Sequence, residues 1–430
     1  MHGTQQHPDD TRSALLQRFR LIRQTTENIA APLSPEDQQV QSMPDASPTK
    51  WHLAHVSWFF ETFVLVPYAP DYTLFDEKFG FLFNSYYEAV GPRHARPHRG
   101  MLTRPTLSRV MAYRAHVDEA MSNFIEAAED EDFRTAEARI ELGLNHEQQH
   151  QELVLMDIKH MLSCNPLAPA YSDRYADVKS NAPAQDWAEV AGGIVSIGHD
   201  EHGFAFDNEG PRHEVLLQDF RIATRLTTNR EYIDFLTDGG YSKPEFWHMD
   251  GWATVTREGW EAPLYWSNRD GAWHMFTLAG EREIDLDAPV SHVSFYEASA
   301  YAVWAGKRLP LEAEWEAAAD PFNLTSECET TANLLSSENF GPTPARDADA
   351  PAQMIGDLWE WTASPYTPYP NFKTPPGAIG EYNGKFMVNQ MVLRGGSFAT
   401  PPSHIRHTYR NFFYPHQRWA FSGIRLADSG

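Results

Sequence analysis

Two histidines four residues apart in "LNHEQQHQELVL", residues 144–155, have the spacing of a pair that binds one metal ion. The stretch has no proline or glycine and few β-branched residues, so it predicts a helix. On a helix, His146 and His150 share one face, with their Cβ atoms about 5–6 Å apart. The pair fits a metal site, but it fits hydrogen-bonded histidines on a polar helix equally well.

Glu147 directly follows His146, as in the helix of a zinc protease where the glutamate acts as general base. Side chains adjacent in a helix point about 100° apart. The Glu147 carboxylate is therefore poorly placed for an ion held by His146, and the zinc-protease interpretation is the weaker alternative.

A third ligand is expected from "SPTKWHLAHVSWFFETFVLV", residues 47–66, which contains His52 and His55. His55 has tryptophans one turn before and after it, so it lies in the stripe that must face a protein interior. His52 points about 60° away from that stripe. A buried imidazole needs partners, and a shared ion would supply one. We favour His55, with His52 as the alternative and a satisfied core histidine as the non-metal interpretation.

Three neutral imidazoles would leave coordination positions open, which suits catalytic zinc or non-haem iron. Gln149 lies on the same side of the helix and could hydrogen-bond a ligand on the ion, while Glu152 could orient a histidine. Both are also typical of a solvated helix face. The only cysteines are Cys164 and Cys328, so a thiolate zinc site is excluded.

Four helical stretches must position these residues: 9–30, 47–66, 107–129 and 133–163. Their apolar stripes predict a four-helix bundle over residues 10–165, and Ser47 followed by Pro48 is a typical N-cap signal. A linker follows at 166–184. Residues 185–430 predict a second, α+β domain of short strands, rich in tryptophan, in which only residues 294–307 and 311–319 look helical.

The charge balance limits the partners. Lys and Arg total 35 against 59 Asp and Glu, a formal net charge of −24, which repels nucleic acids and anionic membranes. The first residues lack a signal-peptide pattern, and no apolar run reaches the roughly 18 residues that span a bilayer. We expect a cytoplasmic protein that acts on small molecules, without nucleic-acid or membrane partners.

A basic segment interrupts this acidic chain at "FNSYYEAVGPRHARPHRGMLTRPT", residues 83–106. Its arginines, among them Arg96 and Arg99, predict a site for small anions such as the carboxylates of amino acids. A solvated loop paired with the acidic surface is the alternative. Tyr86 and Tyr87, just upstream, could bring a phenolic proton donor to the metal or could simply pack.

Near the C-terminus, "TYRNFFYPHQRW" gathers aromatic residues around Asn411. Aromatic faces attract quaternary ammonium groups, although such a run is also typical of a core.

The motifs that carry a family resemblance are "KWHLAHVSWFFETFVL", "NHEQQHQE", "GFAFDNEGPRHEV", "RLPLEAEWEAAA", "GDLWEWTASPY", "LRGGS" and "TYRNFF". Over nearly its whole length, the chain closely resembles the EgtB-type sulfoxide synthases of ergothioneine biosynthesis. The resemblance implies a DinB-like four-helix bundle followed by a formylglycine-generating-enzyme-like domain related to C-type lectins. It also implies a centre of Fe(II) held by His55, His146 and His150.

Further roles follow from the resemblance alone. Gln149 would contact the substrate imidazole, and Tyr86 and Tyr87 would form the catalytic tyrosine pair. Arg96 and Arg99 would bind the carboxylate of the sulfur donor. Asn411 and Phe412 would bind the trimethylammonium group of hercynine, which is Nα-trimethylhistidine.

The reaction implied by the resemblance joins the sulfur of cysteine to imidazole C2 of hercynine with O2 and forms a sulfoxide. Family branches that use γ-glutamylcysteine carry an Asp and an Arg where this chain has Phe413 and Gln417, which favours free cysteine. Cys328 is the only cysteine of the second domain and lies outside "RGGS", which disfavours sulfatase-activating chemistry. The alternatives are a selenoneine- or ovothiol-type synthase, a zinc-dependent thiol transferase or hydrolase, and a non-catalytic lectin-like module.

Overall fold

The computed structural model describes residues 8–175, 181–319, 332–346 and 351–429. By its internal contacts the chain divides into two units, Met1–Cys164 with Gly377–Glu381, and Asn165–Pro376 with Tyr382–Gly430. Each unit is described by itself below. Among the described residues, no helix combines the length and apolar character needed to cross a membrane.

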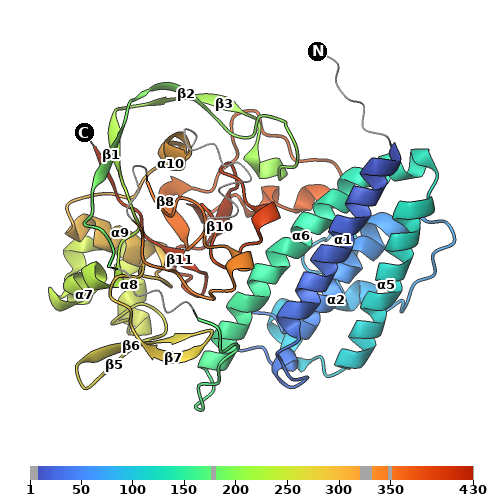
Figure 1. The fold of residues 1–430 in the computed structure, drawn as a ribbon, viewed down its shortest axis with the longest axis horizontal. Coiled ribbons are helices and arrows are strands. Elements are labelled where there is room, and N and C mark those ends of the chain that lie inside the picture. Colours follow the sequence, from blue (N-terminus) through green and yellow to red (C-terminus); the bar gives the residue numbers. More distant parts are fainter. Residues whose placement is uncertain (1–7, 176–180, 320–331, 347–350, 430) are drawn as a thin grey trace. The chain divides into compact units, whose positions relative to one another are not determined.

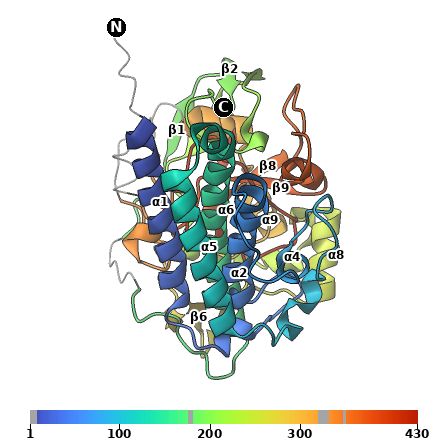
Figure 2. The same cartoon turned by 90° about the vertical axis from the view of Figure 1, so that its right-hand side faces the viewer.

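The first unit is built on four long helices that lie side by side (Figures 1 and 2). They are α1 (Pro8–Ala30), α2 (Thr49–Phe60), α5 (Leu107–Ala127) and α6 (Asp130–Ser163), with the short α3 (Val66–Tyr68) and α4 (Phe79–Phe83) between them. Helices α1 and α2 each pack against both α5 and α6. The predicted helical bundle is confirmed.

Helix α2 is the innermost helix of this bundle, because every residue from Thr49 to Phe60 is buried. It continues into a π-helical turn, Glu61–Leu65. The predicted N-cap is wrong. The helix begins at Thr49, after Pro48, and the Ser47 hydroxyl instead accepts a hydrogen bond of 2.9 Å from Nη1 of Arg99.

Gly143 lets helix α6 approach α2 closely, one turn before His146. A Cβ atom added at Gly143 would lie 2.5 Å from Cε1 of Phe60, closer than real Cβ contacts allow. Glycine costs about 1 kcal/mol of helix propensity relative to alanine in a helix interior. Here it permits the contact between the two helices that carry the histidines.

The described residues of the second unit form four small sheets. Their strand orders are β1-β4-β12, β10-β9-β8-β11, β2-β3 and β5-β6-β7, and all pairs are antiparallel except β11 with β8. The strands are β1 (Trp187–Val190), β2 (Gly193–Ile197), β3 (His213–Leu217), β4 (Phe220–Ala223), β5 (Trp266–Arg269), β6 (Ala272–Thr277), β7 (Gly280–Glu283), β8 (Trp359–Pro365), β9 (Met391–Arg394), β10 (Asn411–Phe413), β11 (Ser422–Gly423) and β12 (Ala427–Ser429).

Its helices are α7 (Asn229–Thr237), α8 (Met249–Glu258), α9 (Phe295–Trp304) and α10 (Glu312–Ala319). Helices α9 and α10 confirm the two predicted helical stretches, but the expectation that these were the only ones is wrong. The missed helices carry local signals: α7 starts with a Thr228–Glu231 capping box, and α8 ends at Gly259 with φ of 63°.

Candidate metal centre

Three buried histidines from two helices meet inside the first unit. His55 comes from α2, and His146 and His150 come from α6. One ring nitrogen of each lies within 4.8 Å of those of the other two. Nε2 of His55 and Nε2 of His146 are 3.2 Å apart. The structure thus brings together the three residues chosen from helix faces.

The donor set fits a first-row metal ion. The backbone carbonyl of Phe83 accepts a hydrogen bond of 2.7 Å from Nδ1 of His55, so Nε2 of that ring carries the lone pair. With metal–nitrogen distances of about 2.1 Å, two ligand nitrogens lie about 3.0–3.4 Å apart, which matches the observed separation of His55 and His146.

Burial keeps all three imidazoles neutral. Desolvation lowers the pKa of His146 to about 3, and it lowers the pKa of His55 and of His150 well below the usual value for histidine. Only a neutral imidazole offers a lone pair to a metal. The trio is therefore in a ligating form at neutral pH.

Aromatic rings hold His55 in place. Its ring stacks on Trp51, with centroids 4.6 Å apart and planes at 14°, and on Trp58, at 5.5 Å and 18°. Phe59 packs against His146, with ring centroids 4.7 Å apart. The aromatic stripe of α2 thus packs on two of the three metal-ligand candidates.

Glu147 points away from this centre into a network of buried charges. Its carboxylate binds Arg23 of α1 at 2.8 Å and Arg114 of α5 at 3.2 Å. Burial by itself would raise the pKa of Glu147, but the two guanidinium groups outweigh it and hold this pKa below its usual value. Glu147 is a structural ion-pair residue, which removes the basis of the zinc-protease interpretation.

Of the two predicted anion-binding arginines, one is buried and one is exposed. The guanidinium of Arg99 lies 3.4 Å from the centre of a Trp51 ring, and it donates to the hydroxyls of Ser47 and Ser85 at 2.9 and 3.3 Å. Arg96 is exposed and donates to the backbone carbonyl of Asp45. Arg99 touches the indole that stacks on His55.

The tyrosine pair is stacked, with ring centroids 4.7 Å apart. Tyr87 is fully buried and packs on Trp58 at 5.6 Å, the indole that also stacks on His55. Tyr86 is half-buried. The backbone N–H groups of the next two residues donate to the carboxylate of Glu381, which holds this loop within the first unit.

The two polar residues predicted beside the pair on α6 differ in exposure. Gln149, between His146 and His150, is half-buried, while Glu152 is buried. His160 lies farther along the helix, where its Nδ1 is 2.7 Å from the Ser42 hydroxyl.

Asn411 and Phe412 lie in the second unit, on strand β10, paired with Leu393 and Val392 of β9. Both are half-buried, and the ring of Phe412 stacks on Tyr366 with centroids 4.1 Å apart. Cys328 lies outside the described residues.

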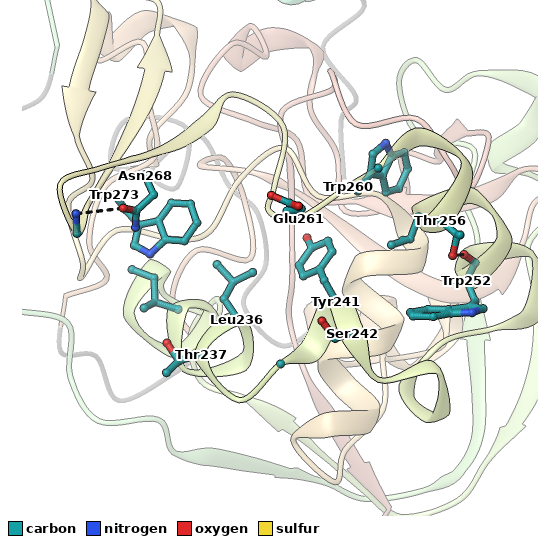
Figure 3. A pocket seen from close by; sticks show the side chains of 15 residues that line it. Leu236, Thr237, Tyr241, Ser242, Trp252, Thr256, Trp260, Glu261, Asn268 and Trp273 are labelled. Atoms are coloured by element: carbon teal, nitrogen blue, oxygen red, sulfur yellow. Dashed lines mark hydrogen bonds between the residues drawn. The ribbon is translucent and has the colours of Figure 1, made fainter.

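The second unit also contains a cleft of about 750 Å³ (Figure 3). Tryptophans 252, 260 and 273 are spread along it rather than gathered around one point. Its lining contains no histidine or cysteine among the described residues, and one carboxylate, Glu261. This cleft therefore lacks a donor set for a metal ion.

Two buried neighbours of His150 were not predicted from the sequence. His52 was considered only as an alternative ligand, and Asp157 was not considered. Both are buried, and both belong to the hydrogen-bond chain that ends on His150. The available signal was spacing, since Asp157 follows His150 by seven residues and therefore lies on nearly the same helix face.

Comparison with known proteins matches both units. The DinB superfamily model matches residues 18–154, and the sulfatase-modifying factor enzyme 1-like domain matches residues 174–339 and 346–429. The class is therefore a DinB-type helical domain with a three-histidine centre, joined to a sulfatase-modifying-factor-like domain.

Relatives that match nearly the full length of this chain identify a family within this class. The chain is 34% identical over 405 residues to the hercynine oxygenase of Mycobacterium tuberculosis, covering 89% of this chain and 91% of the relative. It is 34% identical over 417 residues to that of Mycolicibacterium smegmatis, covering 90% and 92%. The formylglycine-generating enzyme of Thermomonospora curvata is 29% identical over 294 residues, 57% of this chain and 96% of that enzyme. This chain belongs to the hercynine oxygenase family and is an oxygenase.

Proposed function

We propose that this protein joins the sulfur of cysteine to imidazole C2 of hercynine, using Fe(II) and O2, as a sulfoxide synthase of ergothioneine biosynthesis. A C–H bond and an S–H bond break, and a C–S bond and an S–O bond form. Each new bond releases two electrons. The four electrons reduce O2, whose atoms end in the sulfoxide and in water, so no other reductant is needed.

The observation that carries this proposal is the buried trio of neutral histidines in a chain related to hercynine oxygenases over 89% of its length. His55, His146 and His150 would hold the ion. All three donors are imidazole nitrogens, which suits a non-haem Fe(II) centre with open positions. The bound ion would collect the reactants and supply the redox chemistry.

Arg99 supports a carboxylate site for the sulfur donor. Its guanidinium is buried and donates to the neutral hydroxyls of Ser47 and Ser85, and its Nε has no hydrogen-bond partner among the described residues. A buried guanidinium is stabilised by an anion whose oxygens accept its hydrogen bonds, and the cysteine carboxylate would fill this role. Arg96, exposed on the same segment, would add a second positive charge.

Hercynine carries an imidazole and a trimethylammonium group, which need different partners. The Gln149 amide would hydrogen-bond the imidazole. Asn411 and the face of Phe412 would bind the trimethylammonium group, because an aromatic face attracts a cation that cannot donate hydrogen bonds. The hydroxyl of Tyr86 or Tyr87 would carry a proton at its Oη during oxygen reduction.

Uncharged residues at positions 413 and 417 support free cysteine as the donor. The ring of Phe413 packs on Trp419 at 5.7 Å, and the Gln417 side chain accepts from the backbone N–H of Tyr414 at 3.0 Å. A γ-glutamyl group adds a carboxylate and moves the free amino group from the cysteine to the glutamyl end. Neither of these two side chains offers it an opposite charge.

The test is the product formed in air from hercynine, cysteine and protein purified without oxygen and loaded with Fe(II). Mass spectrometry should find the two substrates combined, plus one oxygen atom and minus two hydrogen atoms, with one labelled oxygen from ¹⁸O2. γ-Glutamylcysteine should give little product.

His150→Ala should abolish Fe(II) binding and product formation, because one of three ligands is lost. His160→Ala is the matched control on the same helix, since His160 pairs with Ser42 instead. Full activity of the His150 variant, or product made by a zinc-loaded protein without O2, would contradict the proposal.

A further inference from the structure

A second buried histidine lies directly behind one of the ligand candidates. Nδ1 of His52, on α2, is 2.7 Å from Nδ1 of His150, on α6. On the other side of the same ring, Nε2 of His52 is 3.1 Å from Oδ2 of Asp157. That oxygen also accepts a hydrogen bond of 2.8 Å from the backbone N–H of Ser47. All three side chains are buried.

The Asp157 carboxylate determines which atoms donate and which accept along the hydrogen-bond chain Asp157–His52–His150. Because the Asp157 oxygen accepts, Nε2 of His52 must be the donor. In a neutral imidazole the other nitrogen is then the acceptor, so Nδ1 of His52 accepts from Nδ1 of His150. With its proton on Nδ1, His150 has its lone pair on Nε2.

We propose that His52 and Asp157 are positioning residues, which hold His150 in the tautomer and orientation that present Nε2 to the metal ion. The inference rests on the metal centre of the proposed function. His52 is thereby assigned a role other than the ligand role considered as an alternative above. Partners of this kind fix the ring of a ligating histidine and raise its basicity, and their loss costs about 10–100-fold in metal affinity or activity.

The tautomer of His55 is held in the same way, by a different acceptor. Its Nδ1 donates to the carbonyl of Phe83 at 2.7 Å. Two of the three ligand candidates, one on each helix, thus donate through Nδ1 and keep Nε2 for the ion. A backbone carbonyl holds one ring, while a histidine–aspartate pair holds the other.

The hydrogen-bond chain Asp157–His52–His150 is called the relay below, and a pair of nearly isosteric variants tests it. In His52→Asn the amide oxygen lies near the position of the original Nδ1 and can still accept from His150, whereas His52→Leu has similar size and no acceptor. Affinity for Co(II), as a spectroscopic probe, should stay within a few-fold of wild type in the Asn variant. It should fall about 10–100-fold in the Leu variant.

A second readout reports on the proton itself. In the Co(II) protein, the Nδ1 proton of a ligating histidine gives a paramagnetically shifted NMR signal. The His150 signal should exchange slowly with water in wild type and in His52→Asn, and rapidly in His52→Leu. A role in packing alone would not separate the two variants in this way.

The outcomes separate the relay from the metal centre. If wild type fails to bind Co(II) or Fe(II), the metal centre and the proposed function are wrong. If wild type binds Co(II) and the Leu and Asn variants bind it equally well, the centre stands and the relay is wrong. Should His52→Leu not fold, Asp157→Ala and Asp157→Asn replace the pair, since only Asn keeps the acceptor for His52. Equal affinities there would also overturn the relay.

Discussion

Replacing Glu147 by Gln should destabilise the protein strongly, although the substituted residue directly follows a proposed metal ligand. The carboxylate is buried and binds Arg23 at 2.8 Å and Arg114 at 3.2 Å, and both of these side chains are buried too. Glutamine keeps the shape of the side chain but removes the charge, and it can turn an N–H donor toward a guanidinium.

The magnitude follows from which charges remain. Arg23 retains Asp118 at 2.6 Å, and Arg114 retains a longer contact to Glu27 at 3.5 Å. Breaking a buried ion pair by removing one partner costs about 3–5 kcal/mol when the other charge stays buried without compensation. Because Arg23 and Arg114 each keep one other carboxylate, we expect the lower end of this range, a loss of about 3 kcal/mol in the free energy of unfolding.

Urea unfolding followed by far-UV circular dichroism measures this loss. Glu141→Gln is the matched control on the same helix, because Glu141 pairs with Arg18 at 3.1 Å and their side chains are 37% and 31% exposed. An exposed pair of this kind contributes about 0–1 kcal/mol. The control should therefore unfold at nearly the wild-type urea concentration.

The opposite pattern would refute the reasoning. If Glu147→Gln were as stable as the control and bound Fe(II) normally, yet lost activity by orders of magnitude, the carboxylate would be acting in the reaction. The zinc-protease assignment of this residue predicts that pattern.

Two further predictions concern other buried charges of the first unit. Arg99→Gln should raise KM for cysteine about 10–100-fold, the value of a charge-assisted hydrogen bond, and leave KM for hercynine nearly unchanged. The control for steady-state kinetics is Arg109→Gln, because Arg109 is exposed and pairs with Asp76 at 3.0 Å. Equal KM values for cysteine in the two variants would contradict the prediction. Burial lowers the pKa of Lys159 to about 7. In the unfolded chain the lysine pKa is about 10.4, so above pH 7 the unfolded chain binds more protons than the folded protein. The free energy of unfolding should therefore rise from pH 7 to 10 by up to about 1.4 kcal/mol per pH unit. Lys159→Met should flatten this rise in urea titrations, and an unchanged slope would argue against a neutral buried lysine.

Helix periodicity in the sequence was enough to predict several features of the first unit. The 3.6-residue repeat was sufficient to predict the helices of the bundle and to place His146 and His150 on one face, with Glu147 turned away. The tryptophans around His55 were sufficient to assign it to the interior. The family resemblance, carried by motifs along the chain, is confirmed by relatives that share 34% of its residues.

Local signals failed where two interpretations had the same pattern. Ser47 before Pro48 looks like an N-cap, yet its hydroxyl accepts from Arg99, which is far along the chain. Helices α7 and α8 are short, and their caps lie among the Gly, Asp and Asn residues that also signal loops.

Partners were decided only by the tertiary structure. Periodicity states which way a side chain points from its own helix axis, but not which element lies opposite. Glu147 became an ion-pair residue because α1 and α5 place Arg23 and Arg114 beside it. His52 contacts His150 and is not one of the three clustered histidines, because the packing of α2 on α6 brings those two rings together. The sequence by itself determined the ligand candidates, while helix packing determined what surrounds them.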